Sequence, residues 1–360
     1  MSEKHPDPLP TPEPETPPET PVARTLSIAA ALTAVIAIIV LAFSWPALTA
    51  DPQGISIAVT GPQQAVTQVE EQLSTSGEVY DVTVVEDRDA AVAGIEARDY
   101  MGGIVLGAEP EVLTASANGA VNEVVAQLAV PLEANLIQQS GVPPGDQTTV
   151  TVTDIAPFSE DDPNGSLLSS AFFPMLFGGI IGGVLIATVI VGSRRRILAV
   201  TVYSIVGGIV LAGILQLWFG SIQGSFLLNV SAFAMAIAAI AAPMIGCVAL
   251  IGRAGTAIGP VVMMLFANPI SGSALPSQFL PGAWGEIGQY FPPGASATLV
   301  RELSYFPNAD TASSWLVLAG WIVGGVILTA IAYRRSMRTP NTPEPLPADE
   351  SRVLSTAATS

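Results

Sequence analysis

The chain has 360 residues, of which 50% are hydrophobic and only 12% are charged, and its formal net charge is −17. A charged fraction so far below the roughly 25% of soluble domains argues against a water-soluble globular protein. The negative charge is local, because residues 51–165 hold 19 acidic and two basic residues whereas the rest of the chain holds 11 of each. An acidic segment of this kind repels nucleic acid, so we expect no nucleic-acid partner.

The chain starts with a proline-, glutamate- and threonine-rich segment, residues 1–25, that contains almost no large apolar residues. Such a composition cannot build a core, so we predict a disordered cytosolic tail. The uncharged stretch Leu26–Phe43 follows, and residues 26–48 are assigned to the first transmembrane helix. Its length and its distance from the N-terminus favour a membrane anchor over a cleavable signal peptide.

Residues 51–166 have the size of one domain and are predicted to form an acidic α/β extracytoplasmic domain inserted between the first and second spans. Runs rich in β-branched residues alternate with helical stretches, which favours a partly parallel sheet. Asp87 is placed to cap a helix through Ala97, and Pro131 is expected to break a helix over Val121–Gln139. Strands are expected at Ile55–Thr60, Tyr80–Val85, from about Tyr100 with its centre at Gly103–Leu106, at Val112–Ser116 and at Thr148–Asp154.

No catalytic constellation is visible in this domain. The Gly61-Pro62 turn could bind a ligand, but a glycine-proline turn before a helix is more often simple helix-start chemistry. The acidic run Glu160–Gly165 lacks the alternating ligand spacing of a calcium loop, so we interpret it as a solvated turn that enters the membrane. The only histidine, His5, lies in the tail. We therefore expect no enzymatic activity, no metal site and no cofactor.

Five more apolar stretches without charged residues follow, and they complete a predicted α-helical integral membrane protein with six transmembrane helices. A helix needs roughly 20 apolar residues to cross a bilayer core of about 30 Å. The shortest stretch is Ala254–Ile270, the fifth of the six. Because charged groups inside spans usually mark ion pathways, their absence argues against proton- or sodium-coupled transport. The stretches are Leu167–Val191, Ile197–Phe219, Leu227–Ile251, Ala254–Ile270 and Trp315–Tyr333, within a five-helix domain at 167–333.

The arginines fix an orientation. Basic residues gather on the cytoplasmic side of membrane spans. Placing both termini in the cytosol brings Arg24, Arg194-Arg195-Arg196, Arg253 and Arg334-Arg335 to the cytoplasmic face. The domain at 51–166 then lies outside, and residues 334–360 form a second disordered cytosolic tail. Arginine outnumbers lysine by twelve to one, which indicates a GC-rich genome and hence a bacterial plasma membrane.

Small and mildly polar residues recur inside the spans. Glycine pairs four residues apart permit close helix approach, either within one molecule or with a second copy. Pro243 and Pro260 predict kinks. Tyr203, Ser204, Gln216, Asn229, Ser231 and Asn268 are expected to join helices by hydrogen bonds, and the glycine pairs are Gly178/Gly182, Gly179/Gly183, Gly255/Gly259 and Gly320/Gly324.

The segment 271–312 is predicted to be an outer re-entrant segment. It is rich in proline, glycine and aromatic residues, and tryptophan and tyrosine favour the headgroup level of a bilayer. Leu299-Val300-Arg301-Glu302-Leu303 is expected to form a short amphipathic helix.

This part of the chain contains Asn268-Pro269-Ile270-Ser271-Gly272, Leu280-Pro281-Gly282-Ala283-Trp284-Gly285, Phe291-Pro292-Pro293-Gly294-Ala295 and Leu299-Val300-Arg301, and Asp162-Pro163-Asn164-Gly165 stands before the second span. With these motifs the chain resembles type-2 ABC exporter permeases, and looks closest to their phage-infection-protein-like (Pip-like) branch. The resemblance covers residues 24–335 and agrees with the layout of one span, an outer domain and five further spans. The candidate motif residues are Asn268, Pro269, Gly272, Pro281, Trp284, Pro292, Pro293, Gly294 and Arg301.

The resemblance implies a homodimeric permease in the lipid bilayer that depends on a separate ATPase subunit to export an amphipathic, lipidic or polymeric substrate. The ATPase would meet the loop Gly192–Arg196, which contains Arg194, Arg195 and Arg196 and is shorter than the coupling helix of such exporters. The chain has no phosphate-binding loop of its own. The alternative function is that of a non-transporting cell-envelope protein whose extracytoplasmic domain binds a partner.

Overall fold

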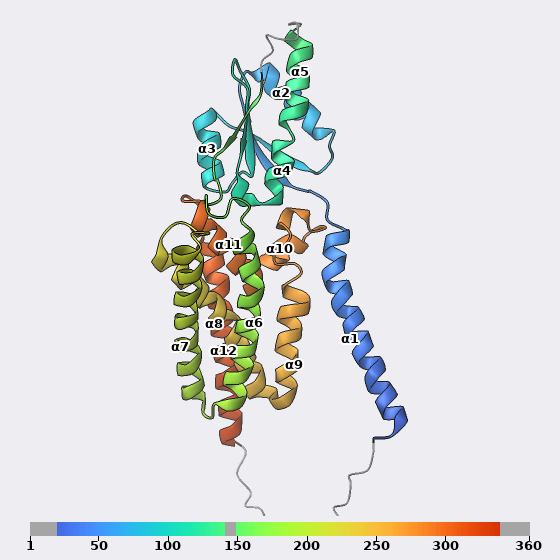
Figure 1. Ribbon diagram of the computed structural model, residues 1–360, viewed down its shortest axis with the longest axis vertical. Coiled ribbons are helices and arrows are strands. Elements are labelled where there is room, and N and C mark those ends of the chain that lie inside the picture. The colour runs from blue at the N-terminus through green and yellow to red at the C-terminus, as the bar shows by residue number, and fades with distance from the viewer. Residues whose placement is uncertain (1–19, 141–148, 339–360) are drawn as a thin grey trace, which may run out of the picture.

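Long apolar helices run side by side through the lower part of the computed structural model, which describes residues 20–140 and 149–338 (Figure 1). Within these residues, five helical stretches are long and apolar enough to cross a membrane. A small sheet with its own helices covers one end of them. The five stretches are Val22–Leu48, Ser166–Val189, Ser193–Trp218, Phe226–Ala267 and Ala312–Arg335.

The fourth stretch covers 42 residues and contains the fourth predicted span and most of the fifth, up to Ala267. Helix α8 (Phe226–Ile251) ends at Gly252, whose φ of +63° suits glycine. The chain then returns along α8 through a 3₁₀ turn (Gly252–Ala254), α9 (Gly255–Pro260) and a π-helix, η4 (Val261–Ala267). A Cβ on Gly255 would lie 2.4 Å from the Cys247 carbonyl oxygen.

The returning arm, 255–267, is shorter than the roughly 20 residues that a full crossing requires. Pro260, at which a kink was predicted, stands where the α-helix changes to the wider π-helix. By contrast, α8 continues as α-helix through Pro243. The count of six spans therefore stays a prediction, because the structure supplies five stretches of sufficient length.

Helix α8 is the centre of the bundle. It packs against α6 (Ser166–Val189), α7 (Ser193–Ala212, continued by the π-helix η2, Gly213–Trp218) and α12 (Ala312–Arg338). Its alanine-rich face lets the neighbouring backbones come close, as small residues do in membrane helices. A Cβ on Gly183 of α6 would lie 2.8 Å from the Ala241 carbonyl oxygen, and one on Gly325 of α12 would lie 2.4 Å from the carbonyl carbon of Ala242.

Hydrogen bonds join these helices at the mildly polar positions. The Tyr203 hydroxyl of α7 donates to the Gly178 carbonyl of α6 at 2.8 Å. The Asn229 amide of α8 donates to the Gln216 side chain of η2 at 3.0 Å. The predicted interhelical role is confirmed for these residues, whereas the Ser231 hydroxyl donates within α8, to Leu227.

Helix α1 (Val22–Leu48) stands apart from the bundle, and none of its apolar span is buried (Figure 1). It begins four residues earlier than the predicted span, so 22–25 belong to the helix and not to a tail. Likewise α12 continues to Arg338, which moves 334–338 out of the predicted tail. The remaining parts of both predicted tails, 1–19 and 339–360, lie outside the described residues.

Between α1 and α6 the chain forms the α/β unit, which we define as residues 51–165. Its five strands form a mixed sheet of order β2-β1-β3-β4-β5, in which only β3 and β4 are antiparallel. Helices α2, α3, α4 and α5 cover the sheet (Figure 1). The strands are β1 (Ile55–Thr60), β2 (Tyr80–Val84), β3 (Gly102–Val105), β4 (Glu111–Thr114) and β5 (Thr151–Asp154); the helices are α2 (Gln63–Ser74), α3 (Arg88–Glu96), α4 (Ala120–Ala126) and α5 (Ala129–Ser140).

Local sequence signals account for most of this unit. Asp87 caps α3 by accepting a hydrogen bond from the Ala90 amide at 2.8 Å, as predicted. The predicted helix 121–139 is interrupted, but the break at Gln127–Leu128 precedes Pro131, which lies in the first turn of α5. That is where proline is tolerated, because first-turn amides have no partner within the helix.

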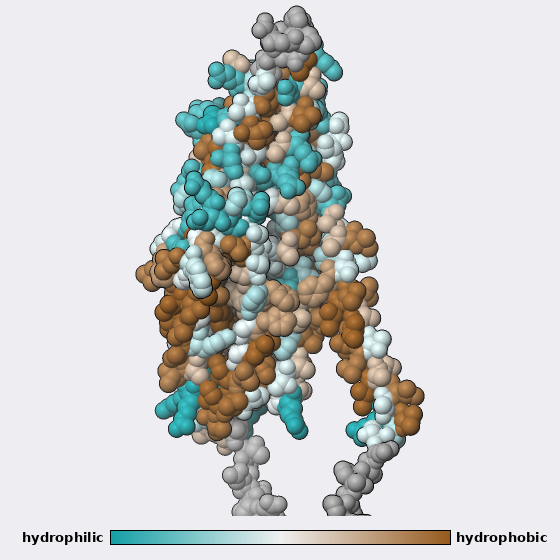
Figure 2. All heavy atoms as spheres, in the orientation of Figure 1, coloured by the Kyte–Doolittle hydropathy of each residue, from teal (hydrophilic) through white to brown (hydrophobic). Residues whose placement is uncertain are grey.

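The two ends of the bundle differ in charge. The starts of α1 and α7, the α8–α9 connection and the end of α12 all lie at the end far from the sheet, and each carries arginine (Figure 1). We call this the arginine end and the opposite one the sheet end. Hydrophobic side chains dominate the surface between them, and hydrophilic ones the α/β unit (Figure 2).

The packing of α8 generates a stability prediction. Replacing Gly183 with alanine forces a methyl group against the α8 backbone, and overpacking of this kind costs about 1–3 kcal/mol. We expect a lower midpoint of thermal unfolding in detergent. Gly213, where α7 passes into η2, is the matched control, because no atom lies within 4 Å of where its Cβ would stand. A Gly183→Ala variant as stable as Gly213→Ala would contradict the close approach of α6 and α8.

Candidate functional site

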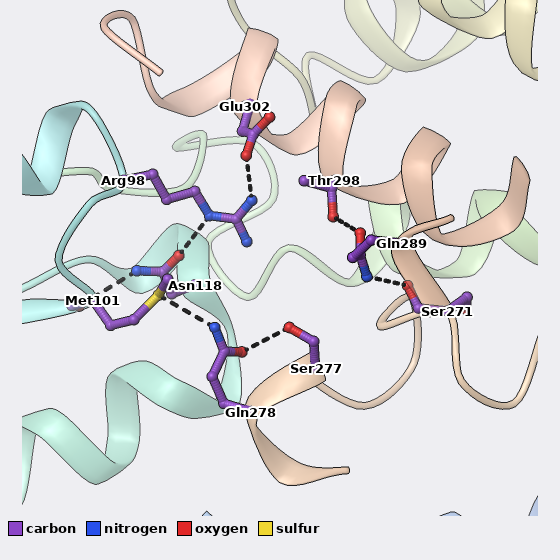
Figure 3. Close-up of polar contacts among 9 residues, drawn as sticks. All are labelled: Arg98, Met101, Asn118, Ser271, Ser277, Gln278, Gln289, Thr298 and Glu302. Carbon is purple, nitrogen blue, oxygen red and sulfur yellow. Dashed lines mark hydrogen bonds and ion pairs between the residues drawn. The ribbon is translucent and has the colours of Figure 1, made fainter. Parts of the chain in front are cut away.

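A polar junction connects the α/β unit to the sheet end of the bundle. It is built on α11 (Pro292–Tyr305), which lies below the sheet and packs against α8 and α12. The Arg98 guanidinium of the α/β unit donates to Glu302 of α11 at 2.9 Å, and the two side chains are only 13% and 12% exposed. Figure 3 shows this ion pair among the surrounding polar contacts.

Arg98 has an unusual backbone. Its φ of +64° makes it the one non-glycine residue with a positive φ among the described residues. It terminates α3, where the Gly94 carbonyl accepts from the Asp99 and Tyr100 amides. Glycine is the usual residue at such a helix end, and another residue pays about 1 kcal/mol or more of strain. Strain that persists in this way marks a position where the side chain is needed.

The Arg98 side chain is held from several sides. Its Nε donates to the Asn118 side chain at 3.4 Å, and the guanidinium lies 5.4 Å from the centre of the Phe306 ring. A cation over an aromatic face is attracted by the ring quadrupole. These contacts fix the direction of Arg98 toward α11.

Arg301, the neighbour of Glu302, has no acidic partner of its own in the described part of the chain. Its Nε is closed off from solvent and makes no hydrogen bond. Burial, together with the positive charge of Arg98, lowers the pKa of Arg301 to about 10. Arg301, Arg98 and Gly272 line a small polar cavity of about 10 Å³, room for about one water molecule.

Two glutamines tie the segment 271–289 to this cavity. The Gln289 side chain donates to the Ser271 carbonyl at 3.3 Å and accepts from the Thr298 hydroxyl at 2.6 Å. The Gln278 amide donates to the sulfur of Met101 at 3.7 Å, which joins the segment to the α/β unit (Figure 3). The polar junction therefore contains groups from three separate parts of the chain.

The start of α6 corrects one expectation. Asp162 is not in a solvated turn: it is 4% exposed and caps α6, accepting from the Ser166 amide at 3.0 Å and the Leu167 amide at 2.9 Å. Gly165, with φ of +61°, brings the turn against the Phe158 ring. Burial, and the nearby charge of Asp162, raise the pKa of Tyr305, whose hydroxyl donates to the Ser221 carbonyl.

The candidate motif residues separate into three groups. Gly272 and Arg301 line the polar cavity. Pro292 and Pro293 start α11, directly after α10 (Trp284–Gln289), and a Cβ on Gly294 would lie 2.2 Å from the Gly288 carbonyl oxygen. This group makes the sharp bend between the two helices.

The third motif group lines an apolar groove between α1 and the bundle. Pro269, Pro281 and Trp284 form one wall, and α1 forms the other. The groove has a volume of about 570 Å³. Asn268 lies at its edge, where its carbonyl accepts from the Ser271 amide and hydroxyl and so supports the turn after η4.

An aromatic row leads from this groove into the bundle. The Phe266 ring contacts Trp284 at 6.0 Å and Phe291 at 5.4 Å between ring centres, and Phe291 contacts Trp321 of α12 at 5.6 Å. Such ring pairs add stability beyond the area they bury. The row joins α10 and η4 to α12.

The arginine cluster belongs to a helix rather than to a five-residue loop. Helix α7 begins at Ser193, so the α6–α7 connection consists of Ile190–Gly192 only. Arg196 turns back and donates to the Ile190 carbonyl at 2.7 Å, which caps the end of α6. Arg194 and Arg195 remain exposed.

Sequence reasoning missed most residues of the polar junction: Arg98, Met101, Asn118, Gln278, Gln289 and Thr298. A signal for Arg98 existed, since it is one of only two basic residues in the acidic segment. No pattern in the sequence pairs it with Glu302, which lies 204 positions away.

No group of three or more metal-ligating side chains occurs within residues 20–140 and 149–338. Searches found no matching family model, no matching curated protein and no matching solved structure for this chain. The site must therefore be interpreted from its own geometry.

Because the Arg98–Glu302 ion pair is buried, we expect removal of the Glu302 charge to lower the stability strongly. Glu302→Gln leaves Arg98 and Arg301 facing each other without a counter-charge, and breaking a buried pair in this way costs about 3–5 kcal/mol. Arg88→Gln is the control, because the Arg88–Glu111 pair is exposed, with Arg88 at 44%, and such pairs contribute about 1 kcal/mol or less. Equal thermal stability of the two variants in detergent would contradict a structural role for the buried pair.

Removal of the Arg301 charge is expected to have the opposite effect on stability. Its charge is disfavoured by burial and by Arg98, so Arg301→Met should raise stability by of order 1 kcal/mol. Because folded Arg301 loses its proton above about pH 10, the gain should be constant at lower pH and shrink as the pH rises through 10. A drop in the unfolding temperature at neutral pH would mean that the charge has a partner that stabilises it.

Proposed function

We propose that this chain is the permease-like subunit of an ABC-type exporter in a bacterial plasma membrane, and that a separate ATPase drives the outward movement of an amphipathic, lipidic or polymeric substrate. The observation that carries the proposal is the assembly of the candidate motif residues. Scattered over 268–301, they meet at the sheet end of the bundle. Gly272 and Arg301 line the polar cavity, Pro269, Pro281 and Trp284 line the apolar groove, and the others shape the turns beside them.

The proposal places both termini in the cytosol and the α/β unit outside. The arginine end gathers the basic residues at one face of the bundle, which supports this orientation by the positive-inside rule (Figure 1). The proposed layout has six crossings, with 254–270 as the fifth. Its π-helix and shortness would be accommodated by local thinning of the bilayer and by neighbouring helices.

The energy source is proposed to be external. The spans carry no charged residue between their ends, which disfavours ion coupling. Arg194 and Arg195 are exposed in the first turn of α7 and would meet the ATPase or anionic lipid headgroups. Since Arg196 caps α6, it is assigned to structure.

A homodimer is proposed through the open face of α12. Among the four glycine pairs, Gly320 and Gly324 have no atom within 4 Å of their Cβ positions, whereas every member of the other three pairs has a neighbour within that distance. Those three pairs thus pack within the molecule.

The second candidate function is that of a non-transporting envelope protein whose α/β unit binds a partner. The favouring observation is the local charge: residues 51–165 carry 19 acidic against two basic side chains. Removal of residues 55–155 distinguishes the two. A binding protein loses all activity, whereas an exporter keeps some transport as long as the spans assemble.

Single cysteines test the orientation and the fifth crossing. Cys247 is the only cysteine, so Cys247→Ala supplies a cysteine-free background. On intact cells, an impermeant maleimide should label Ser74→Cys and Ser273→Cys but not Thr256→Cys, because 256 lies at the arginine end. Labelling of Thr256→Cys would mean that 254–270 does not cross as proposed.

Copurification tests the energy source. We expect the chain, extracted gently from native membranes, to bring down a nucleotide-binding subunit. The double variant Arg194→Gln/Arg195→Gln should lose that subunit, whereas Arg24→Gln, on the separate helix α1, should retain it. Recovery of no such subunit with the unaltered chain would contradict the exporter function.

A further inference from the structure

The apolar groove has a polar counterpart on the other side of a short strap. The strap consists of residues 51–53, whose amides at Asp51 and Gln53 donate to the carbonyls of Phe279 and Gln278. Beside it lies a polar cleft of about 440 Å³. Both volumes fall in the range of about 300–1,000 Å³ that is typical of ligand sites. The cleft is lined by Gln53, Gly54, Glu78, Ser277, Gln278, Gly282, Gly285, Glu286 and Gln289.

Groove and cleft share one wall. Residues Pro281 and Trp284 face the groove, while Gly282 and Glu286 line the cleft. Gly282 lies between the two sides, with φ of +58°, and its carbonyl accepts from the Gln53 side chain at 3.4 Å. Groove and cleft therefore adjoin along residues 281–286, so a ligand that fills one lies next to the other.

The groove is open to the bilayer. Helix α1 is unburied along its apolar span and approaches the bundle only near the sheet end (Figure 1). Trp45 of α1 and Trp284 of α10 stand on opposite walls, exposed by 60% and 44%. Tryptophan favours the headgroup level, so the groove lies where a lipid's acyl chain meets its head.

The charges that line the cleft favour a positively charged ligand. Its only ionisable side chains are Glu78 and Glu286, both exposed, and neither forms an ion pair with any described residue. Its amides are largely engaged: Gln53 with the Leu280 carbonyl, and Gln289 with Ser271 and Thr298. A positively charged head gains from the two carboxylates, whereas an anionic head is repelled.

We propose that groove and cleft together bind one lipid-like amphiphile of the outer leaflet, whose acyl chain lies between α1 and the bundle and whose head carries a positive charge. This inference names a substrate class for the proposed exporter and rests on its membrane orientation. It does not depend on the ATPase, so binding can be measured on the isolated chain.

Brominated lipids test the site, because bromine on an acyl chain quenches tryptophan fluorescence at short range. The reporter variant keeps Trp45 and Trp284 and replaces the other three tryptophans with phenylalanine. It is placed in phosphatidylcholine nanodiscs that contain a small fraction of brominated lipid with a trimethylammonium, a phosphocholine or a phosphoglycerol head. We expect local enrichment of the cationic lipid of roughly five-fold for each carboxylate reached.

Three variants sharpen the result. Glu78→Gln/Glu286→Gln should abolish the head preference and keep the quenching. Ala42→Phe narrows the groove from the unburied helix α1, without a packing cost to the bundle, and should reduce quenching by every lipid. A second reporter keeps only Trp218, which is 77% exposed on the α7 side of the bundle, and should show no preference.

Equal quenching by the three heads, or a preference shared by Trp218 or retained in the double glutamine variant, would overturn the charged-head assignment. No quenching at Trp45 and Trp284 would overturn the groove as a lipid site and point to a second copy covering it. Neither result bears on the recovery of a nucleotide-binding subunit, which is the separate test of the exporter function.

Discussion

The buried ion pair of Arg98 with Glu302 is the one ion pair between the α/β unit and α11 among the described residues. The links to α1 and α6, hydrogen bonds such as Asn308 to Glu96, the Phe158–Tyr305 ring contact and a shared apolar cluster also join the α/β unit to the bundle. Burial makes the pair costly to form and more costly to break. The strained backbone of Arg98 and its contacts with Asn118 and Phe306 hold the pair in a single geometry.

From this contact the arrangement of α11 follows. Because Glu302 is fixed, its neighbour Arg301 is directed into the polar cavity, and the bend formed by Pro292, Pro293 and Gly294 sets where α10 lies. Helix α10 in turn carries Trp284 and Glu286, one facing the apolar groove and the other the polar cleft. A movement of the α/β unit would therefore shift α10 and change the shape of both the apolar groove and the polar cleft.

The bundle below is organised by close backbone contact rather than by polar groups. Where water supplies no hydrophobic drive, helices associate through small residues, and α8 offers alanine and glycine toward α6, α7 and α12. Helix α1 lacks such a partner and stays apart. That separation leaves the groove beside Trp45 and Trp284 open.

The sequence by itself determined the elements whose cause is local. Uncharged runs of sufficient length predict the long helices, and runs of β-branched residues predict strands such as Ile55–Thr60. Asp87 predicts the start of α3, which it caps. Sequence reasoning failed where a residue's role depends on a distant neighbour. Asp162 was predicted to be exposed to solvent, because nothing nearby in the sequence indicates its burial. Arg98 and Glu302 are 204 positions apart, and only the tertiary structure brings them together, since an ion pair depends on distance in space and not on spacing along the chain.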